Sequence, residues 1–112
     1  MDVPLRGHQR IDQRSLALHR AIAEKLRNDP ALLAIAHDNI ERRTREGGRS
    51  QPYWDAWREI LSRPLPEVLD AMVEEGERMT ALRQATPFAG VLTPSERWTI
   101  YEKFQLEPVA TK

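Results

Sequence analysis

The residues best suited to chemistry are a few imidazole and guanidinium groups near the amino terminus. His8, His19 and His37 are the histidines of the chain, and Arg14 precedes His19 by five positions. An imidazole can transfer protons near neutral pH, and a guanidinium group can hold phosphate oxygens. Arg14 and His19 are therefore the strongest catalytic candidates.

The R-x4-H spacing of Arg14 and His19 resembles the motif of HEPN-type ribonucleases, where it lies at a helical dimer interface. The resemblance implies a metal-independent ribonuclease that needs a dimer to bring two such pairs together. That family carries the motif late in its domain, whereas here it falls on the first predicted helix. Two residue types at one loose spacing also recur by chance. We therefore expect no enzyme activity and keep the ribonuclease as an alternative.

The remaining polar residues lack the spacing of a metal or nucleophile site. The chain has no cysteine, and no two histidines stand in the H-x3-H arrangement of zinc hydrolases, so we expect no metal site. His37 and Asp38 are neighbours, and adjacent residues on a helix point about 100° apart. Surface positions are the simpler interpretation for both.

A basic turn with two glycines joins the second and third predicted helices. The segment from Arg45 to Ser50 could present backbone N–H groups to a phosphate. Helix capping explains the same residues, because Gly47 suits the left-handed end of one helix and Ser50 suits the start of the next. No nucleotide-binding glycine motif accompanies the turn. We therefore interpret it as a pair of helix caps and expect no cofactor.

The same helix pair could imitate a helix-turn-helix unit that offers Gln51, Asp55 and Arg58 to DNA bases. An apolar aromatic face and the acidic residues Asp55 and Glu59 oppose this hypothesis, because phosphates repel carboxylates. DNA binding by an autoregulator stays an alternative. The arginines that would serve it are Arg42, Arg43, Arg45, Arg49 and Arg58.

Apolar residues at steps of three and four positions predict five helices. We expect the first over residues 12–28 with Asp12 as its N-cap, and the second from Asp29-Pro30 to Gly47-Gly48. A third helix, capped by Ser50, carries a heavily aromatic face. The members of that face are Tyr53, Trp54, Trp57, Ile60 and Leu61.

The fourth predicted helix runs from Val68 to Leu82 across an acidic stretch in which Gly76 weakens it. The motif Thr93-Pro94-Ser95-Glu96 is a capping box with proline at the first helical position, and it predicts the start of a fifth helix. No segment alternates with period two for long enough to predict a strand. The expected fold class is all-α, a compact array of about five helices with short capped turns.

Length and composition favour one globular domain, since the 112 residues are 40% hydrophobic and 30% charged with a formal net charge of +0. We expect a flexible basic arm over residues 1–11, a single helical domain over 12–106 and a tail over 107–112. The neutral sum argues against a protein built mainly to bind nucleic acid. Without a long apolar run or a secretory signal, we expect a cytoplasmic protein that makes no membrane contact.

Charge is unevenly distributed along the chain. Residues 1–28 carry six basic and three acidic side chains, whereas residues 64–84 carry two basic and five acidic ones. The two segments could face each other within the chain or in a homodimer. Alternatively, the basic segment could bind a partner molecule.

Three stretches together carry a family resemblance: RSLALHRAIAEKLRNDPALL from Arg14, GGRSQPYWDAWREIL from Gly47, and LRQATPFAGVLTPSERWTIYEKF from Leu82. They resemble a family of small, poorly characterised bacterial helical proteins associated with toxin-antitoxin-like gene pairs. The resemblance covers residues 14–104. It implies an antitoxin-like protein that binds and neutralises a companion enzyme, and it supplies no catalytic residues.

The function expected from these observations is that of a non-enzymatic protein-interaction module. Its partner would be a companion protein, a toxin enzyme, whose acidic or nucleotide-binding cleft would contact basic side chains of this chain. The residues expected to bind the partner are Arg6, Arg10, Arg14, Arg45 and Arg49.

Overall fold

The structure, a computed structural model, describes residues 7–110, with side chains described for residues 10–104. Helices account for most of this part of the chain, and it contains no strand, which confirms the all-α class. Six α-helices and one 3₁₀ turn are present where about five helices were expected. They are α1 (Gly7–Asn28), η1 (Pro30–Leu32), α2 (Leu33–Glu46), α3 (Gln51–Leu61), α4 (Leu65–Met72), α5 (Glu77–Gln84) and α6 (Pro94–Ala110).

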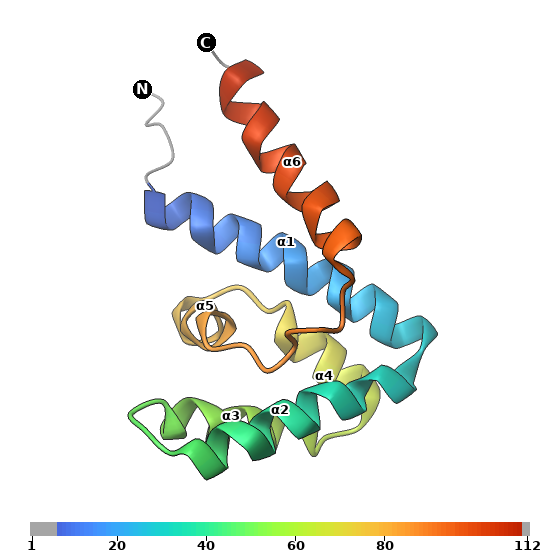
Figure 1. Ribbon diagram of the computed structural model, residues 1–112, viewed down its shortest axis with the longest axis vertical. Coiled ribbons are helices and arrows are strands. Elements are labelled where there is room, and N and C mark those ends of the chain that lie inside the picture. Colours follow the sequence, from blue (N-terminus) through green and yellow to red (C-terminus); the bar gives the residue numbers. More distant parts are fainter. Residues whose placement is uncertain (1–6, 111–112) are drawn as a thin grey trace.

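The helices are arranged around α1 (Figure 1). α2 and α3 lie side by side as an αα-hairpin, and α4 and α5 fill the space between this hairpin and α1. α6 packs on α1, and its carboxyl-terminal half points away from the other helices. The described core therefore lies between α1 and the hairpin.

Trp57 lies at the centre of this core. Its indole Nε1–H donates a hydrogen bond to the Leu82 carbonyl oxygen at 2.9 Å, and its ring meets Phe88 edge to face with centroids 5.4 Å apart. The buried apolar side chains come from α1 to α5 and from the connector of residues 85–93, whereas α6 adds only the partly buried Ile100 among the described side chains. Edge-to-face packing and a satisfied indole N–H fix how α3, α5 and the connector meet.

Local signals set two helix boundaries as predicted. Thr93 N–H donates to Glu96 Oε1 at 2.7 Å, and Glu96 N–H donates to Thr93 Oγ1 at 3.1 Å, so the capping box of α6 is confirmed. Gly47 ends α2 with a φ of +74°, in the region that favours glycine. Asp29 and Ser50 hold the predicted N-cap positions, but neither side chain makes a capping hydrogen bond.

The predicted start of the first helix is wrong, because α1 begins at Gly7. Asp12 lies inside α1, and its carboxylate accepts a hydrogen bond from the Gln84 amide at 2.7 Å instead of capping the helix. The early turns of α1 are supported by α6, through the Arg10 guanidinium on the Phe104 carbonyl oxygen. The expected flexible arm is therefore helical from residue 7, and residues 1–6 lie outside the described residues.

The predicted fourth helix is two helices, α4 and α5. The chain turns between them at Gly76, whose φ of +132° and ψ of 161° lie in a region that essentially only glycine occupies. Arg83 of α5 reaches back and donates to the carbonyl oxygens of Met72 and Glu74, at 3.2 and 2.8 Å. These bonds satisfy carbonyl groups that the end of α4 leaves free.

The predicted tail after residue 106 is also wrong in part, because α6 continues through Pro108 to Ala110. Proline has no N–H, so Pro108 cannot bond the carbonyl group four residues earlier, which belongs to Phe104. The Arg10 guanidinium donates to that same carbonyl oxygen. A tertiary contact thus replaces the missing helix bond, and residues 111–112 lie outside the described residues.

Candidate functional site

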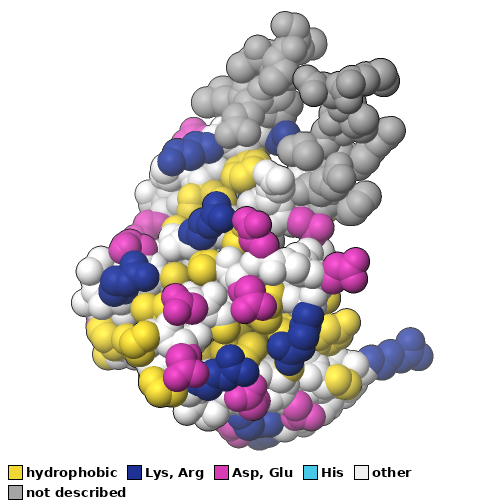
Figure 2. All heavy atoms as spheres, turned by 180° about the vertical axis from the view of Figure 1, so that it is seen from behind, with side chains coloured by type: hydrophobic (Ala, Val, Ile, Leu, Met, Phe, Trp, Pro, Cys, Tyr) yellow, Lys and Arg dark blue, Asp and Glu magenta, His cyan; other side chains and the backbone are white. Residues whose placement is uncertain are grey.

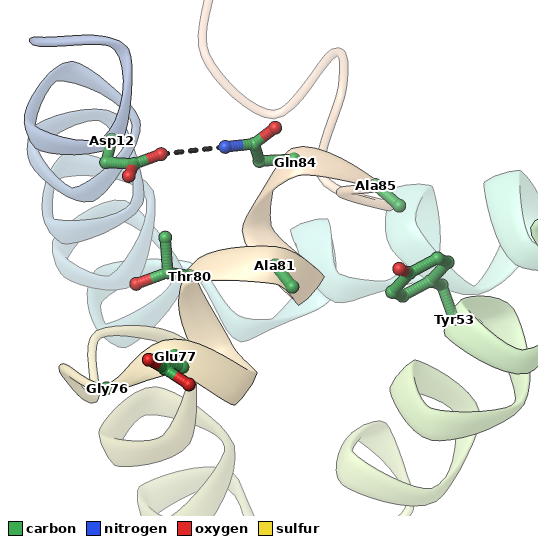
Figure 3. Close-up of a pocket in the computed structure, with 8 residues that line it drawn as sticks. All are labelled: Asp12, Tyr53, Gly76, Glu77, Thr80, Ala81, Gln84 and Ala85. Atoms are coloured by element: carbon green, nitrogen blue, oxygen red, sulfur yellow. Dashed lines mark hydrogen bonds between the residues drawn. The ribbon is translucent and has the colours of Figure 1, made fainter. Parts of the chain in front are cut away.

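A hollow on the described surface lies over α5, and we call it the α5 groove. It has a volume of about 690 Å³. Three elements line it: α1, α3, and α5 with the turn before it (Figure 3). Its lining residues are Asp12, Tyr53, Gly76, Glu77, Thr80, Ala81, Gln84 and Ala85.

The floor of the α5 groove is made of short side chains. Ala81 of α5 and Ala85, directly after the end of α5, lie on the side that faces Tyr53, whereas Thr80 and Gln84 lie on the side that faces α1 (Figure 3). Both alanines line the groove, and together they form a small, low surface. Another backbone can approach such a surface closely.

Tyr53 forms one wall of the α5 groove. It is 41% exposed, whereas the next residue, Trp54, is buried. Neighbouring helix positions point about 100° apart, and of these two side chains Tyr53 is the one that faces the groove. The hydrogen bond from Trp57 to the Leu82 carbonyl oxygen ties α3 to α5 and holds Tyr53 beside it. Tyr53 was expected on the buried aromatic face, and the structure corrects that expectation.

The opposite wall is polar and acidic. Asp12 accepts a hydrogen bond from Gln84, and the charged residues that line the groove, Asp12 and Glu77, are both acids. Glu75, on the adjoining turn, pairs with Arg20 at 3.3 Å. A ligand that enters this groove therefore meets an aromatic ring on one side and carboxylates on the other.

The structure places His19 in the interior, with only 2% of its surface exposed. Its Nδ1 lies 2.7 Å from the Ser15 carbonyl oxygen, and its Nε2 lies 2.9 Å from Thr86 Oγ1. A carbonyl oxygen can only accept, so Nδ1 carries the proton, and in the neutral ring the Thr86 hydroxyl donates to Nε2. That hydroxyl also accepts from the Phe88 N–H at 3.1 Å. Burial lowers the pKa of His19 to about 4.

The structure does not bring Arg14 and His19 together. Arg14 is exposed, and its guanidinium lies 4.9 Å from the centroid of the Tyr101 ring on α6. Positions five apart on a helix point about 140° apart, so one member of the pair faces solvent and the other faces the core. Both nitrogens of His19 already have partners within the chain. This geometry offers no imidazole to an RNA backbone.

Of the five arginines expected to bind a partner, the four that the structure describes do not share one surface. Arg6 lies outside the described residues, whereas Arg10 and Arg14 contact α6 through Phe104 and Tyr101. Arg45 and Arg49 are exposed near the turn between α2 and α3, at the other end of the molecule (Figure 1).

The residues expected to read DNA bases bond to one another. The Gln51 amide donates to Asp55 at 2.8 Å, and Arg58 lies 3.3 Å from Asp55. Arg58 also contacts Glu41 at 3.3 Å and Thr44 at 3.0 Å across the hairpin. α3 buries Trp54 and Trp57 in the core, and its polar side chains bond to residues of α2 and α3. Its side chains are therefore engaged in contacts within the chain.

Opposite charges are interspersed over the face shown in Figure 2. The basic segment of α1 meets acidic residues elsewhere in the chain, through Arg20 with Glu75 and Lys25 with Glu96 at 2.7 Å. Lys25 lowers the pKa of Glu96, and hydrogen bonds from Thr93 add to the effect. The uneven charge of the sequence is thus partly neutralised within the fold.

Two further observations concern the kind of site present. Within residues 10–104, no three side chains of His, Asp or Glu gather closely enough to hold a metal ion. None of the described helices combines the length and the apolar character needed to cross a bilayer.

Comparisons with protein-family models, with curated proteins and with solved structures gave no match to this chain.

The α5 groove was missed by sequence reasoning because its residues come from three helices between positions 12 and 85. The sequence carries no decisive signal for the exposure of Tyr53, because adjacent positions of a helix can both be buried, as Ile60 and Leu61 of α3 are.

Proposed function

We propose that this chain is a non-enzymatic protein-interaction module that binds a helical segment of a companion protein in the α5 groove. The observation that carries the proposal is the groove itself, an open hollow of about 690 Å³ with a floor of short side chains beside an exposed tyrosine. Helix-in-groove binding uses surfaces of this kind. A helix is about 10–12 Å across with its side chains, and the small floor residues let its backbone come close.

The chemistry of the lining favours a partner helix that is apolar on one side and basic at its edge. The Tyr53 ring can pack against an apolar or cationic side chain, and tyrosine is enriched among residues that dominate binding energy. Asp12 and Glu77 lie where a lysine or arginine of the partner would be attracted. Both carboxylates would repel an acidic partner segment, which adds specificity.

The finer proposal is that the companion is a bacterial enzyme and that this chain neutralises it in the manner of an antitoxin. The family resemblance over residues 14–104 supports it, and the buried position of His19 makes catalysis by this chain a weaker hypothesis. Steric blocking requires only a stable complex, so it needs no catalytic group on this chain.

The test is co-purification from the native host with adjacent genes intact, followed by affinity measurement on the purified partner. Ala81 is exposed on the groove floor, and Ala81→Arg should weaken binding by about tenfold or more, because the new side chain fills the groove. Ala34→Arg is the matched control, since Ala34 is an exposed alanine on α2 outside the groove.

Equal affinities of the wild type and Ala81→Arg for the partner would contradict binding in the groove. Growth of cells that express the partner alone tests the finer proposal. Growth arrest that this chain relieves supports an antitoxin, and normal growth contradicts it.

A further inference from the structure

A second hollow lies beneath α6, and we call it the α6 cavity. Its volume is about 150 Å³. α1, the connector of residues 85–93, and α6 contribute its walls. The lining residues are Leu18, His19, Ile22, Thr86, Phe88, Ala89, Gly90, Leu92, Arg97 and Tyr101. None of them lines the α5 groove, so occupancy of the α6 cavity does not depend on the proposed function.

The walls of the α6 cavity are held in place from several sides. Thr86 is bonded to His19, and the Asn39 amide donates to the carbonyl oxygens of Pro87 and Ala89 at 2.8 and 2.9 Å. These bonds fix the connector between α1 and α2. Lys25 and Glu96 join α1 to the start of α6 at 2.7 Å. The cavity is therefore preformed, which reduces the ordering cost of binding.

The size and lining of the cavity suit a single aromatic ring. Its apolar walls include Leu18, Ile22, Phe88 and Leu92. Apolar cavities of about 150 Å³ lined by leucine, isoleucine and phenylalanine take up benzene. A ligand of this size would replace missing van der Waals contacts of the lining atoms.

The charge at the cavity favours an anionic group on that ring. Arg97 is exposed and is the one lining residue with a permanent positive charge. Arg14 adds a second cation nearby, since its guanidinium lies over the ring of Tyr101, which lines the cavity. The lining includes no carboxylate. Guanidinium groups bind carboxylates with charge-assisted hydrogen bonds.

We propose that the α6 cavity binds a small aromatic carboxylate, with its ring between α1 and the connector and its carboxylate at Arg97. Benzoate, benzene and benzylammonium are matched probes, because they share the ring and differ in charge. The measurement is a titration of the full-length chain with each probe, followed by the methyl NMR signals of Leu18, Ile22 and Leu92.

Benzoate should shift these methyl signals saturably and bind about tenfold or more tightly than benzylammonium. Arg97→Gln should reduce the affinity for benzoate to that for benzene and leave benzene binding unchanged. Lys103→Gln is the control, since Lys103 is an exposed cation of α6 that does not line the cavity. Two results would overturn the proposal: the absence of a saturable shift with benzoate, or equal affinities for benzoate and benzylammonium.

Discussion

His19 joins α1 to the connector, and its neutral ring is what the fold requires. The Nδ1–H donates a hydrogen bond to the Ser15 carbonyl oxygen, and Nε2 accepts one from the Thr86 hydroxyl. That hydroxyl oxygen in turn accepts a hydrogen bond from the Phe88 N–H. The ring also meets Phe88 edge to face with centroids 5.8 Å apart. A residue that the sequence predicts as a catalytic candidate thus holds two segments together, α1 and the connector.

The burial of His19 predicts a pH dependence of stability. Its pKa is about 4 in the folded chain and 6.5 when unfolded, so the unfolded state binds more protons between these values. The stability contribution is present above pH 6.5 and is lost as the pH falls from 6.5 toward 4, with a total on the order of 3 kcal/mol. Urea unfolding at pH 7.5, 6 and 5 measures this loss.

His19→Gln should remove this part of the pH dependence, because glutamine does not titrate. His37→Gln is the control, since His37 is exposed on α2, and it should keep the wild-type slope. If His19→Gln and the wild type lose stability equally between pH 7.5 and 5, the folded pKa of His19 is not depressed.

At the scale of elements, boundaries set by local chemistry could be predicted from the sequence, and boundaries set by distant contacts could not. The capping box at Thr93 and the glycine at the end of α2 act through neighbouring residues. The start of α1 and the continuation of α6 depend on the Arg10 bond to Phe104, which joins residues 94 positions apart. A short stretch of sequence cannot predict a contact between residues so far apart.

The break between α4 and α5 makes Gly76 the most conformationally restricted position of this turn. Its φ of +132° and ψ of 161° suit neither alanine nor asparagine, although asparagine tolerates the left-handed helical region. Gly76→Ala and Gly76→Asn should both lower the free energy of unfolding by about 1–3 kcal/mol. No atom lies within 4 Å of a Cβ added there, so the expected loss comes from the backbone alone.

Urea unfolding of the two Gly76 variants checks this prediction. Full recovery of stability in Gly76→Asn would show that the turn uses the ordinary left-handed conformation. Unchanged stability in both variants would show that α4 and α5 can join as one helix, as the apolar spacing of the sequence predicts.

At the scale of the whole molecule, the chain is a closed core with one attached helix. The described core draws its buried side chains from α1 to α5 and the connector, and α6 rests on α1 with Trp98 still 54% exposed. The candidate site could not be predicted from the sequence, because the groove and the cavity arise where three elements meet. The arginines expected to bind a partner illustrate the same limit, since the fold gives Arg10 and Arg14 contacts within the chain.

The attachment of α6 through a few surface contacts predicts that it opens independently of the core. Arg14 stacks on Tyr101 of α6, and such a contact contributes about 0.5–1 kcal/mol. Arg14→Ala should therefore speed amide exchange in α6 by about two- to fivefold, while exchange in α2 and α3 stays unchanged. Arg43→Ala is the matched control, because it removes a similar contact with Trp54 inside the hairpin, 5.7 Å from the ring centroid. Since a chain that unfolds only as a unit would show equal changes in every helix, faster exchange throughout the Arg14→Ala variant would contradict the independent opening of α6.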